Sequence, residues 1–317
     1  MSGTDRPRVR RNLDGLLLLD KPSGLTSNAA LQRVKWLYRA RKAGHTGSLD
    51  PLASGMLPIC FGEATKFAGY LLDANKTYRV QARFGIRTDT ADAEGQPVAY
   101  SRLPLPSRAA IEQALAGLRG PIFQVPPMYS ALKVQGQRLY SLARAGREVP
   151  REARPVHIHE FELEDYDPER PIFRVECSKG TYIRSLIEDL ATALGTLAHV
   201  VVLRRLCVGP FEAEAMLPLA ALEAKAAAPA PEGGETALDR FLRPLEAVLP
   251  LWPEVCLDAA SALRVRQGAT VQVPVQPGSI GQVRIHGPEG VFLGIGELGS
   301  DGRLVPRRLV ATPAGCD

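Results

Sequence analysis

Cysteine is scarce in this chain. Its 317 residues include five cysteines, an odd number, and no two of them have C-x-x-C spacing. Such a set excludes the disulfide framework of a small secreted domain and the paired ligands of a structural zinc site. We therefore predict a reducing compartment. We interpret Cys60 and Cys177 as small core residues rather than as nucleophiles.

Long apolar runs are also missing. Leu16 to Leu19 form an apolar run near the N-terminus, but four leucines are too few for the apolar region of a signal peptide. No run approaches the roughly 18 apolar residues that a membrane-spanning helix requires. We expect a soluble cytoplasmic protein, in which the glycosylation pattern from Asn75 to Thr77 is accidental.

Nucleotide-binding motifs are absent or out of context. The chain has no G-x-x-x-x-G-K-[ST] phosphate-binding loop. The stretch GIGELG, Gly294 to Gly299, fits G-x-G-x-x-G, but no helix-forming sequence follows it. A dinucleotide site needs these glycines between a strand and a helix, so we do not predict one here.

Metal-binding patterns are equally weak. In the stretch RTDTADAEG, the residues Asp89, Asp92 and Glu94 miss the spacing of a calcium-binding EF-hand loop, and we interpret the segment as a solvated hairpin turn. His157 and His159 could share one face of a strand, but no acid or cysteine is suitably placed beside them. We predict no metal site and interpret both histidines as surface or RNA-proximal residues.

Positive charge is in slight excess. Lys and Arg number 39 against 34 acidic residues, which gives a net charge of +5 and a pI near 9.0. The excess is concentrated between residues 133 and 154, close to Tyr129 and Tyr140. Cations for phosphates and rings for stacked bases are common in RNA-binding proteins. A solvated surface of helix and loop would carry the same charges, so charge alone leaves both interpretations open.

The apolar pattern predicts both helices and strands. Residues 77–84 alternate, with Tyr78, Val80, Ala82 and Phe84 on one face, as in a half-buried strand. Further strands are expected over residues 172–177 and 198–203. Helices are expected from Thr26 or Ser27 to Tyr38, from the capping residue Ser107 to a closing Gly120, and over Ile183 to Leu194 with Gly195 after its end.

The length allows two domains. Ala and Pro crowd residues 224–231 and Gly233-Gly234 follow, which predicts a loop or linker. Beyond it, short strands are expected over residues 270–275, 281–286 and 291–295, separated by Gly and Pro turns. We predict three parts: a disordered basic arm at residues 1–13, a first domain at 14–248 and a small all-β domain at 249–317.

One loop holds a single carboxylate among glycines and prolines. In GHTGSLDPLASGMLPICFGEATK, residues 44–66, Asp50 directly precedes Pro51, which disfavours the helical conformation and predicts an extended backbone at Asp50. We expect Gly44, Gly47 and Gly55 to allow turns or close approach of the backbone. A structural turn would use the same residues, so these residues alone do not identify a site.

Several segments together resemble one family, the bacterial tRNA pseudouridine-55 synthases of the TruB type. The resemblance covers nearly all of residues 14–220, with its segments in the order found in the family. The matching segments are LLLLDKPSGLTS (16–27), GHTGSLDPLASGMLPICFGEATK (44–66), KTYRVQARFGIRTDTADAEG (76–95), VPPMYSALKVQGQRLYSLARAGREV (125–149), CSKGTYIRSLIEDL (177–190) and AHVVVLRRL (198–206).

The resemblance implies a fold, an activity and a partner. The implied fold is α+β: a pseudouridine synthase catalytic domain at 14–248 with a large mixed or antiparallel sheet, helices and loops, and a PUA-like RNA-binding domain at 249–317. The implied reaction isomerises uridine 55 in the T-loop of tRNA, without a cofactor, after the base is flipped out. Residues 126–152 match a mobile insertion that closes over the RNA. We expect a monomer.

The resemblance also assigns site residues. Asp50 matches the family's aspartate, which could attack C1′ or C6 or deprotonate C2′ of the target uridine. Arg184 matches the arginine paired with it, and a cation at that distance lowers the pKa of an aspartate. Tyr78 matches a residue that stacks on the uracil and helps to remove the C5 proton, although a plain core tyrosine would fit the same strand position.

A second set of residues is expected around this centre. Tyr182 and Leu203 match residues that line the uracil pocket, and His45 matches one that replaces the flipped base in the loop. Lys21 and Pro22 match a pair that supports the site structurally. Two other functions remain: a catalytic subunit of a guide-RNA-dependent complex, which typically lacks the insertion, and a tRNA-folding chaperone without catalysis.

Overall fold

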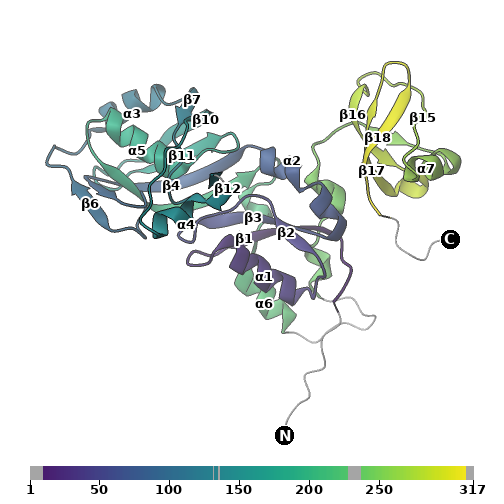
Figure 1. Cartoon of the computed structure of the whole chain (residues 1–317), viewed down its shortest axis with the longest axis horizontal. Coiled ribbons are helices and arrows are strands. Elements are labelled where there is room, and N and C mark those ends of the chain that lie inside the picture. Colours follow the sequence, from purple (N-terminus) through teal and green to yellow (C-terminus); the bar gives the residue numbers. More distant parts are fainter. Residues whose placement is uncertain (1–9, 131, 135, 228–236, 312–317) are drawn as a thin grey trace, which may run out of the picture.

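Two β-sheets organise the chain (Figure 1). The structure, a computed structural model, describes residues 10–130, 132–134, 136–227 and 237–311. Within these ranges the larger sheet has nine strands and mixed topology, and a separate five-stranded sheet lies toward the C-terminus. This is the predicted α+β arrangement with a small C-terminal β unit, so the fold-class prediction is confirmed.

The larger sheet runs in the order β13-β1-β3-β12-β4-β11-β10-β7, and β2 pairs with β3 beside this path. All neighbours are antiparallel except β13 with β1 and β3 with β12, which are parallel. Its strands are β1 (Gly15–Lys21), β2 (Ala43–His45), β3 (Ser54–Phe61), β4 (Lys76–Phe84), β7 (Gly120–Gln124), β10 (Arg154–Asp165), β11 (Ile172–Cys177), β12 (Ala198–Val208) and β13 (Leu217–Pro218).

Helices begin and end largely where their capping residues predict. Thr26 caps α1 (Ser27–Leu37) by accepting from Ala29 N at 3.1 Å, and Ser107 caps α3 (Arg108–Ala116). Helix α3 ends before the predicted Gly120, which instead begins β7. The other helices in the described ranges are α2 (Ala68–Asp73), α4 (Leu139–Arg144), α5 (Ile183–Ala193), α6 (Leu219–Ala226) and α7 (Ala259–Arg266), with 3-10 turns η1 (Gly62–Lys66), η2 (Ala213–Ala215), η3 (Asp239–Phe241), η4 (Leu245–Val248) and η5 (Pro288–Gly290).

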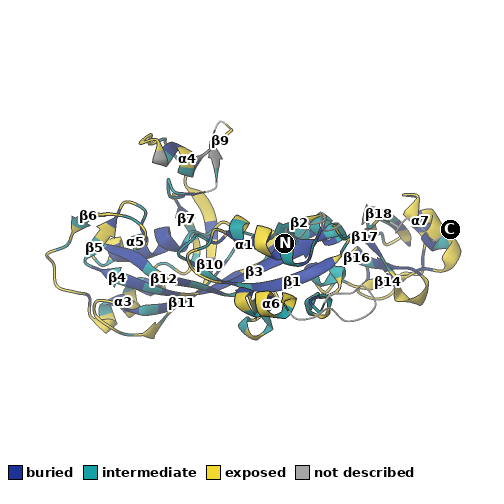
Figure 2. Cartoon of the chain, turned by 90° about the horizontal axis from the view of Figure 1, so that it is seen from below, coloured by how far each residue is buried: buried dark blue, intermediate teal, exposed yellow. Residues whose placement is uncertain are grey.

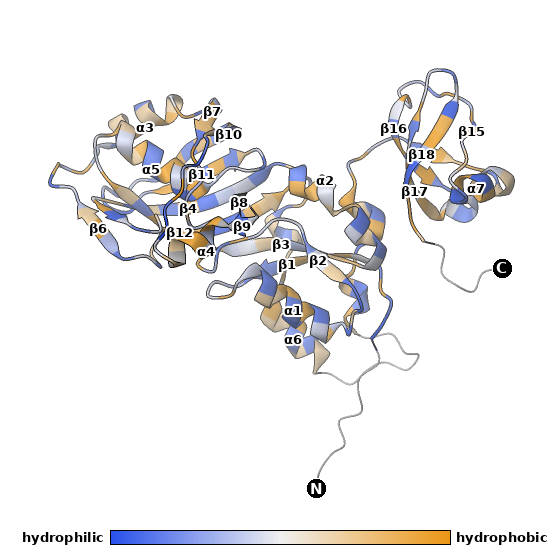
Figure 3. Ribbon diagram, in the orientation of Figure 1, coloured by the Kyte–Doolittle hydropathy of each residue, from blue (hydrophilic) through white to orange (hydrophobic). Residues whose placement is uncertain are grey.

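The main core lies on the larger sheet. Its strands are mostly buried in Figure 2, and α5 packs against β12 and β4. Figure 3 shows both hydrophobic and hydrophilic residues along α1, of which Ala30, Leu31 and Val34 are buried. On β4 the predicted inward residues Tyr78, Val80, Ala82 and Phe84 all belong to this core. The period-two pattern therefore identified the correct face.

The C-terminal sheet has its own core and also packs on the first domain. Its strands follow the order β14-β16-β17-β18-β15. Phe292 and Ile295 belong to an apolar cluster that includes Phe67 and Leu71, so this sheet packs directly against the first domain. The GIGELG stretch lies in and just after β17, as a strand and not a nucleotide loop. The strands are β14 (Glu254–Cys256), β15 (Val271–Gln272), β16 (Gly281–His286), β17 (Phe292–Leu298) and β18 (Arg303–Leu309).

Smaller segments flank the two sheets. Two short hairpins are formed by β5 (Ile86–Thr88) with β6 (Pro97–Tyr100), and by β8 (Lys133–Val134) with β9 (Gln137–Arg138). The segment containing β9 and α4, inside the predicted insertion, projects from the body in Figure 2. Within the described ranges, no helix has the length and apolar character that crossing a membrane would need.

The predicted arm and linker meet the structure only in part. Residues 1–9 of the arm and 228–236 of the linker, including Gly233-Gly234, lie outside the described residues. Arg11 forms an ion pair with Asp239 and bridges to Ala40, so the arm predicted over residues 1–13 contacts the fold before residue 14. Helix α6 continues to Ala226, so the start of the predicted linker is helical because Leu219 and Leu222 are buried.

Candidate active site

Asp50 lies on a loop between β2 and β3 that is fixed at several points. Leu49 N donates to Ser27 Oγ at 2.7 Å, and the same hydroxyl donates to Leu49 O at 3.0 Å. Gly24 N donates to Pro51 O at 2.8 Å. Ser27 is the buried first residue of α1 and Gly24 lies in the turn before it, so the start of the helix and this turn hold the loop on both sides of the carboxylate. The loop predicted to be rigid is tied down by these bonds.

Two of the three glycines singled out in the sequence, Gly44, Gly47 and Gly55, have a backbone role. Gly47 and Gly55 have φ of +94° and +99°, which residues with a Cβ rarely adopt. A Cβ on Gly55 would also come within 2.2 Å of Arg205 O. Gly44 is different, because it lies in β2 with open space around it, so the expectation that it needs to be glycine is wrong.

Arg184 joins three segments at Asp50. Its Nε lies 3.0 Å from Asp50 Oδ2, its Nη1 donates to Thr90 O at 2.9 Å, and its Nη2 donates to Tyr129 O at 2.8 Å. The side chain is only 5% exposed, although it starts in the first turn of α5. A buried guanidinium with several acceptors is held in one orientation. The predicted pairing of Arg184 with Asp50 is present in the structure.

Asp92 completes this cluster and was misinterpreted from the sequence. Its side chain is 4% exposed and its Oδ2 lies 3.5 Å from Arg184 Nη1. It also accepts from Thr90 Oγ1 at 2.6 Å and from Glu94 N at 3.1 Å. The prediction of a solvated turn is wrong here because residues at the turn bridge to Val200 on β12, which brings the hairpin onto the sheet.

The Asp50 carboxyl is not made more acidic overall. Enclosure by protein raises the pKa of Asp50, and the negative charge of Asp92 adds to this. Arg184 and Lys21 act in the opposite direction but do not reverse it. The expectation that Arg184 would leave Asp50 with a depressed pKa is therefore wrong in its net direction, because burial outweighs the ion pair. The side chain still exposes 39% of its surface toward the cavity.

A cavity of about 750 Å³ opens at this cluster. Its volume lies within the usual range for small-molecule sites. Asp50, Arg184 and His45 reach its wall, and Glu94, whose pKa is raised by burial, is also present. Its lining residues are Thr26, Ser27, Asn28, His45, Ser48, Leu49, Asp50, Pro51, Thr90, Asp92, Glu94, Tyr129, Ser130, Tyr140 and Arg184.

Tyr78, Leu203 and Tyr182 lie outside this lining. Tyr78 and Leu203 are buried, 9% and 6% exposed, on the neighbouring strands β4 and β12. Tyr182 is the N-cap residue directly before α5, and its backbone is held by Gln124, whose Nε2 donates to Tyr182 O at 3.2 Å and whose Oε1 accepts from Tyr182 N at 3.0 Å. Burial raises the pKa of both tyrosines.

Lys21 has contacts that suit its predicted supporting role. It is fully buried, and its Nζ donates to Pro22 O at 2.8 Å and to Leu25 O at 2.7 Å. Burial lowers the pKa of Lys21 to about 8, while the nearby charge of Asp50 acts in the opposite direction. The ammonium thus fixes the turn after β1 while remaining close enough to Asp50 to influence it.

The histidines differ in their surroundings. His45 lines the cavity, and its buried Nδ1 has no hydrogen-bond partner within the described part of the chain. Burial lowers the pKa of His45. His157 and His159 are exposed on β10 with ring centroids 4.5 Å apart. In the ranges that the structure describes, no group of three or more His, Cys, Asp or Glu residues could hold a metal ion.

Three family models match most of the chain between residues 35 and 310. The family described as TruB family pseudouridylate synthase (N terminal domain) matches residues 35–183. Residues 184–250 match a tRNA pseudouridylate synthase B C-terminal domain, and residues 253–310 match pseudouridine synthase II TruB, C-terminal.

Curated relatives are similar over nearly the entire chain. A tRNA pseudouridine synthase B of Ectopseudomonas mendocina is 54% identical, covering 97% of this chain and 98% of that one. One of Pseudomonas putida is 53% identical, covering 96% and 97%. Among solved structures, that of a Cbf5-Nop10-Gar1 complex matches with a TM-score of 0.70 and 26% identity, over 94% of this chain and 84% of the other.

Proposed function

The chain belongs to the TruB family of pseudouridine synthases, and from this premise we propose that it isomerises uridine to pseudouridine at position 55 in the T-loop of tRNA. It is a tRNA pseudouridine synthase, an isomerase that acts on uridine in tRNA. The observation that carries the more specific proposal is the placement of Asp50 and Arg184 in ion-pair contact on the wall of one cavity.

This placement suits the chemistry of the reaction. The C1′–N1 bond of the uridine breaks, the base turns, and C5 forms a new bond to C1′, with no net oxidation or reduction. An ionised Asp50 could attack C1′ or C6, or remove the proton from C2′. Each route needs a carboxylate held in one orientation, and the bonds from Ser27 and Arg184 supply that constraint.

The remaining assignments are parts of the same proposal. The target base flips out of the T-loop, His45 takes its place in the loop, and the uracil enters the region bounded by Tyr78, Tyr182 and Leu203. Flipping costs a few kcal/mol of stacking, which contacts from residues 126–152 and from a PUA-like domain at 249–317 would offset. We place the reaction in the cytoplasm, by a monomer without a cofactor.

Two alternatives have less support. Relatives that are 52–54% identical are named tRNA pseudouridine synthase B, whereas the Cbf5-containing structure is 26% identical, which favours a stand-alone tRNA enzyme over a guide-RNA-dependent subunit. A chaperone without catalysis would not need Asp50 and Arg184 in ion-pair contact at a cavity.

Tritium release tests the proposal directly. A T-arm stem-loop would carry uridine labelled with tritium at C5 only at position 55, and a matched stem-loop would carry the label at another uridine. We expect release from the first substrate alone, since C5 loses its hydrogen when it bonds to C1′. No release by the folded protein, or equal release from both substrates, would contradict the proposed function.

A further inference from the structure

Arg205 is a buried cation without an acidic partner. Its side chain is among the largest fully buried ones, at 1% exposure, and it forms no ion pair with any residue that the structure describes. Burying an unpaired charge costs several kcal/mol unless polar groups surround it. A buried guanidinium in this position therefore calls for an explanation beyond packing.

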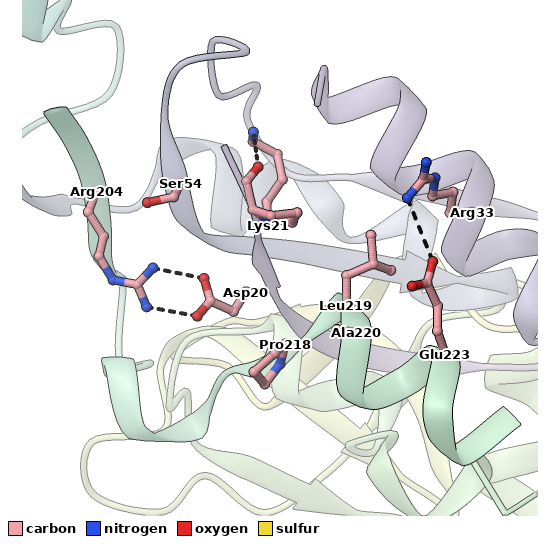
Figure 4. A pocket seen from close by; sticks show the side chains of 10 residues that line it. Asp20, Lys21, Arg33, Ser54, Arg204, Pro218, Leu219, Ala220 and Glu223 are labelled. Atoms are coloured by element: carbon pink, nitrogen blue, oxygen red, sulfur yellow. Dashed lines mark hydrogen bonds and ion pairs between the residues drawn. The ribbon is translucent and has the colours of Figure 1, made fainter. Parts of the chain in front are cut away.

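The neighbouring arginine makes the contrast clear. Arg204 points to the opposite face of β12, as adjacent strand residues do, and forms a two-bond ion pair with Asp20 at 3.0 and 2.8 Å. Figure 4 shows this pair beside a pocket of about 280 Å³, with the Lys21 amine pointing away from it. Of these two arginines, it is Arg205 that faces the side of the sheet where Tyr78 and the Asp50 loop lie.

Arg205 connects three elements of the site. Its Nε donates to Met56 O on β3 at 2.6 Å, and its Nη2 donates to Gly47 O, on the loop that leads to Asp50, at 3.0 Å. Its backbone is paired with Tyr78 on β4. Directly paired residues on adjacent strands point to the same face with neighbouring side chains. The guanidinium therefore lies between the phenol of Tyr78 and the Asp50 loop.

The two buried arginines lie beside different proposed reactive groups. The charge and hydrogen bond of Arg184 lower the pKa of Asp50. Burial raises the pKa of Tyr78, and the charge and N–H groups of Arg205 oppose that rise. Each of the two proposed reactive side chains thus lies beside a different buried guanidinium: Asp50 beside Arg184, and Tyr78 beside Arg205.

We propose that Arg205 is a positioning residue for Tyr78: it holds the phenol in register with the Asp50 loop and favours loss of the phenol proton to solvent, which forms the phenolate that accepts the C5 proton. This inference rests on the proposed function. After C5 has bonded to C1′, the C5–H bond breaks, its electron pair restores the C5–C6 double bond while the pair of the C6–N1 double bond moves onto N1, and the proton passes to the phenolate oxygen. N1 takes a proton from solvent, and the neutral phenol later returns its proton to solvent.

The test compares Arg205→Gln with the matched control Arg204→Gln. Glutamine keeps a donor for a carbonyl but removes the charge. We expect C5 tritium release at saturating stem-loop to fall roughly 10- to 100-fold in Arg205→Gln, as for loss of a group that assists proton transfer. A larger isotope effect with C5-deuterated uridine and partial recovery at higher pH should accompany this fall. Arg204→Gln should stay within about twofold of wild type without a changed isotope effect.

A purely structural role would give a different pattern. Rearrangement of a 5-fluorouridine stem-loop needs no loss of a C5 proton. If Arg205 had only a structural role, Arg205→Gln would slow this rearrangement as much as it slows tritium release, and the isotope effect would stay unchanged. That result in a folded Arg205→Gln would overturn the inference. If this variant does not fold, Arg205→Lys tests the positioning part of the inference: it keeps the charge but loses the forked donors to Met56 O and Gly47 O, and should still slow tritium release more than 5-fluorouridine rearrangement.

A failure of the proposed function can be told apart from a failure of the proposed role of Arg205. If the wild-type protein releases no tritium, the activity itself is wrong. If the wild type is active and a folded Arg205→Gln shows an unchanged isotope effect, only the role of Arg205 is wrong.

Discussion

Nε of Arg184 lies 3.0 Å from Oδ2 of Asp50, and the same guanidinium reaches the buried Asp92 at 3.5 Å. One cation is therefore shared between a carboxylate whose side chain is 39% exposed and one whose side chain is only 4% exposed. The two carboxylates repel each other, which contributes to the raised pKa of Asp50. Arg184 therefore restrains the Asp50 side chain without fully compensating its negative charge, because the same guanidinium also faces Asp92.

Asp50→Asn should abolish isomerisation and leave tRNA binding nearly unchanged. An amide has a similar shape but can neither attack carbon nor accept a proton usefully. C5 tritium release and a tRNA binding titration on the same preparation measure the two effects. Substantial turnover by this variant would remove Asp50 from the chemistry.

Asp92→Asn should lower the rate and shift its pH dependence. Because Asp92 raises the pKa of Asp50, losing its charge should lower that pKa, so the acidic limb of the pH–rate profile should move to lower pH. We expect a loss of roughly tenfold or more in the saturated rate, since Arg184 loses one of its anchors. Asp89→Asn, in the same hairpin, is the control. An acidic limb that moves to higher pH would contradict the assigned sign.

Tyr78→Phe should separate base rearrangement from proton removal. The ring remains for stacking, but the hydroxyl that would carry the proton is gone. We expect this variant still to rearrange a 5-fluorouridine stem-loop in single-turnover assays, while C5 tritium release from uridine becomes slow. Uridine turnover at the wild-type rate would show that the hydroxyl has no chemical role.

Arg266→Gln combined with Arg303→Gln should weaken tRNA binding more than catalysis. Both side chains are exposed on the C-terminal domain, and neither forms an ion pair among the described residues. For every phosphate that the protein no longer neutralises, the salt slope of binding should fall by about 0.7–0.9. Arg307→Gln is the control, because Arg307 is paired with Glu297. An unchanged affinity and salt slope would argue against RNA binding by these arginines.

Lys76→Met should change how stability depends on pH. Burial lowers the pKa of Lys76 from 10.5 to about 8. Between these values the unfolded chain holds a proton that the folded chain has lost, so the contribution of Lys76 to stability rises with pH. The free energy of unfolding of wild type minus Lys76→Met should therefore increase between pH 7.5 and 9.5 by on the order of 1 kcal/mol. Exposed Lys179→Met is the control, and a difference that falls with pH would contradict the assigned sign.

The sequence by itself determined the features that depend on neighbours along the chain. The alternating residues of β4 identified its buried face, and capping by Thr26 and Ser107 located the starts of α1 and α3. The resemblance then located Asp50 and Arg184, because each lies within a long matching segment. These signals are local: capping and strand alternation are decided within a few residues.

Only the tertiary structure decided what surrounds those residues. Asp92 looks like a turn residue until its hairpin bridges to β12, more than 100 positions away, and Arg205 looks like any strand arginine until it is found between β3 and β4. The net direction of the Asp50 pKa shift was likewise inaccessible, because Arg184 is visible as a matching residue but burial is not. Burial and the register between distant strands arise from packing of the whole chain, so neither can be read from residues adjacent in sequence.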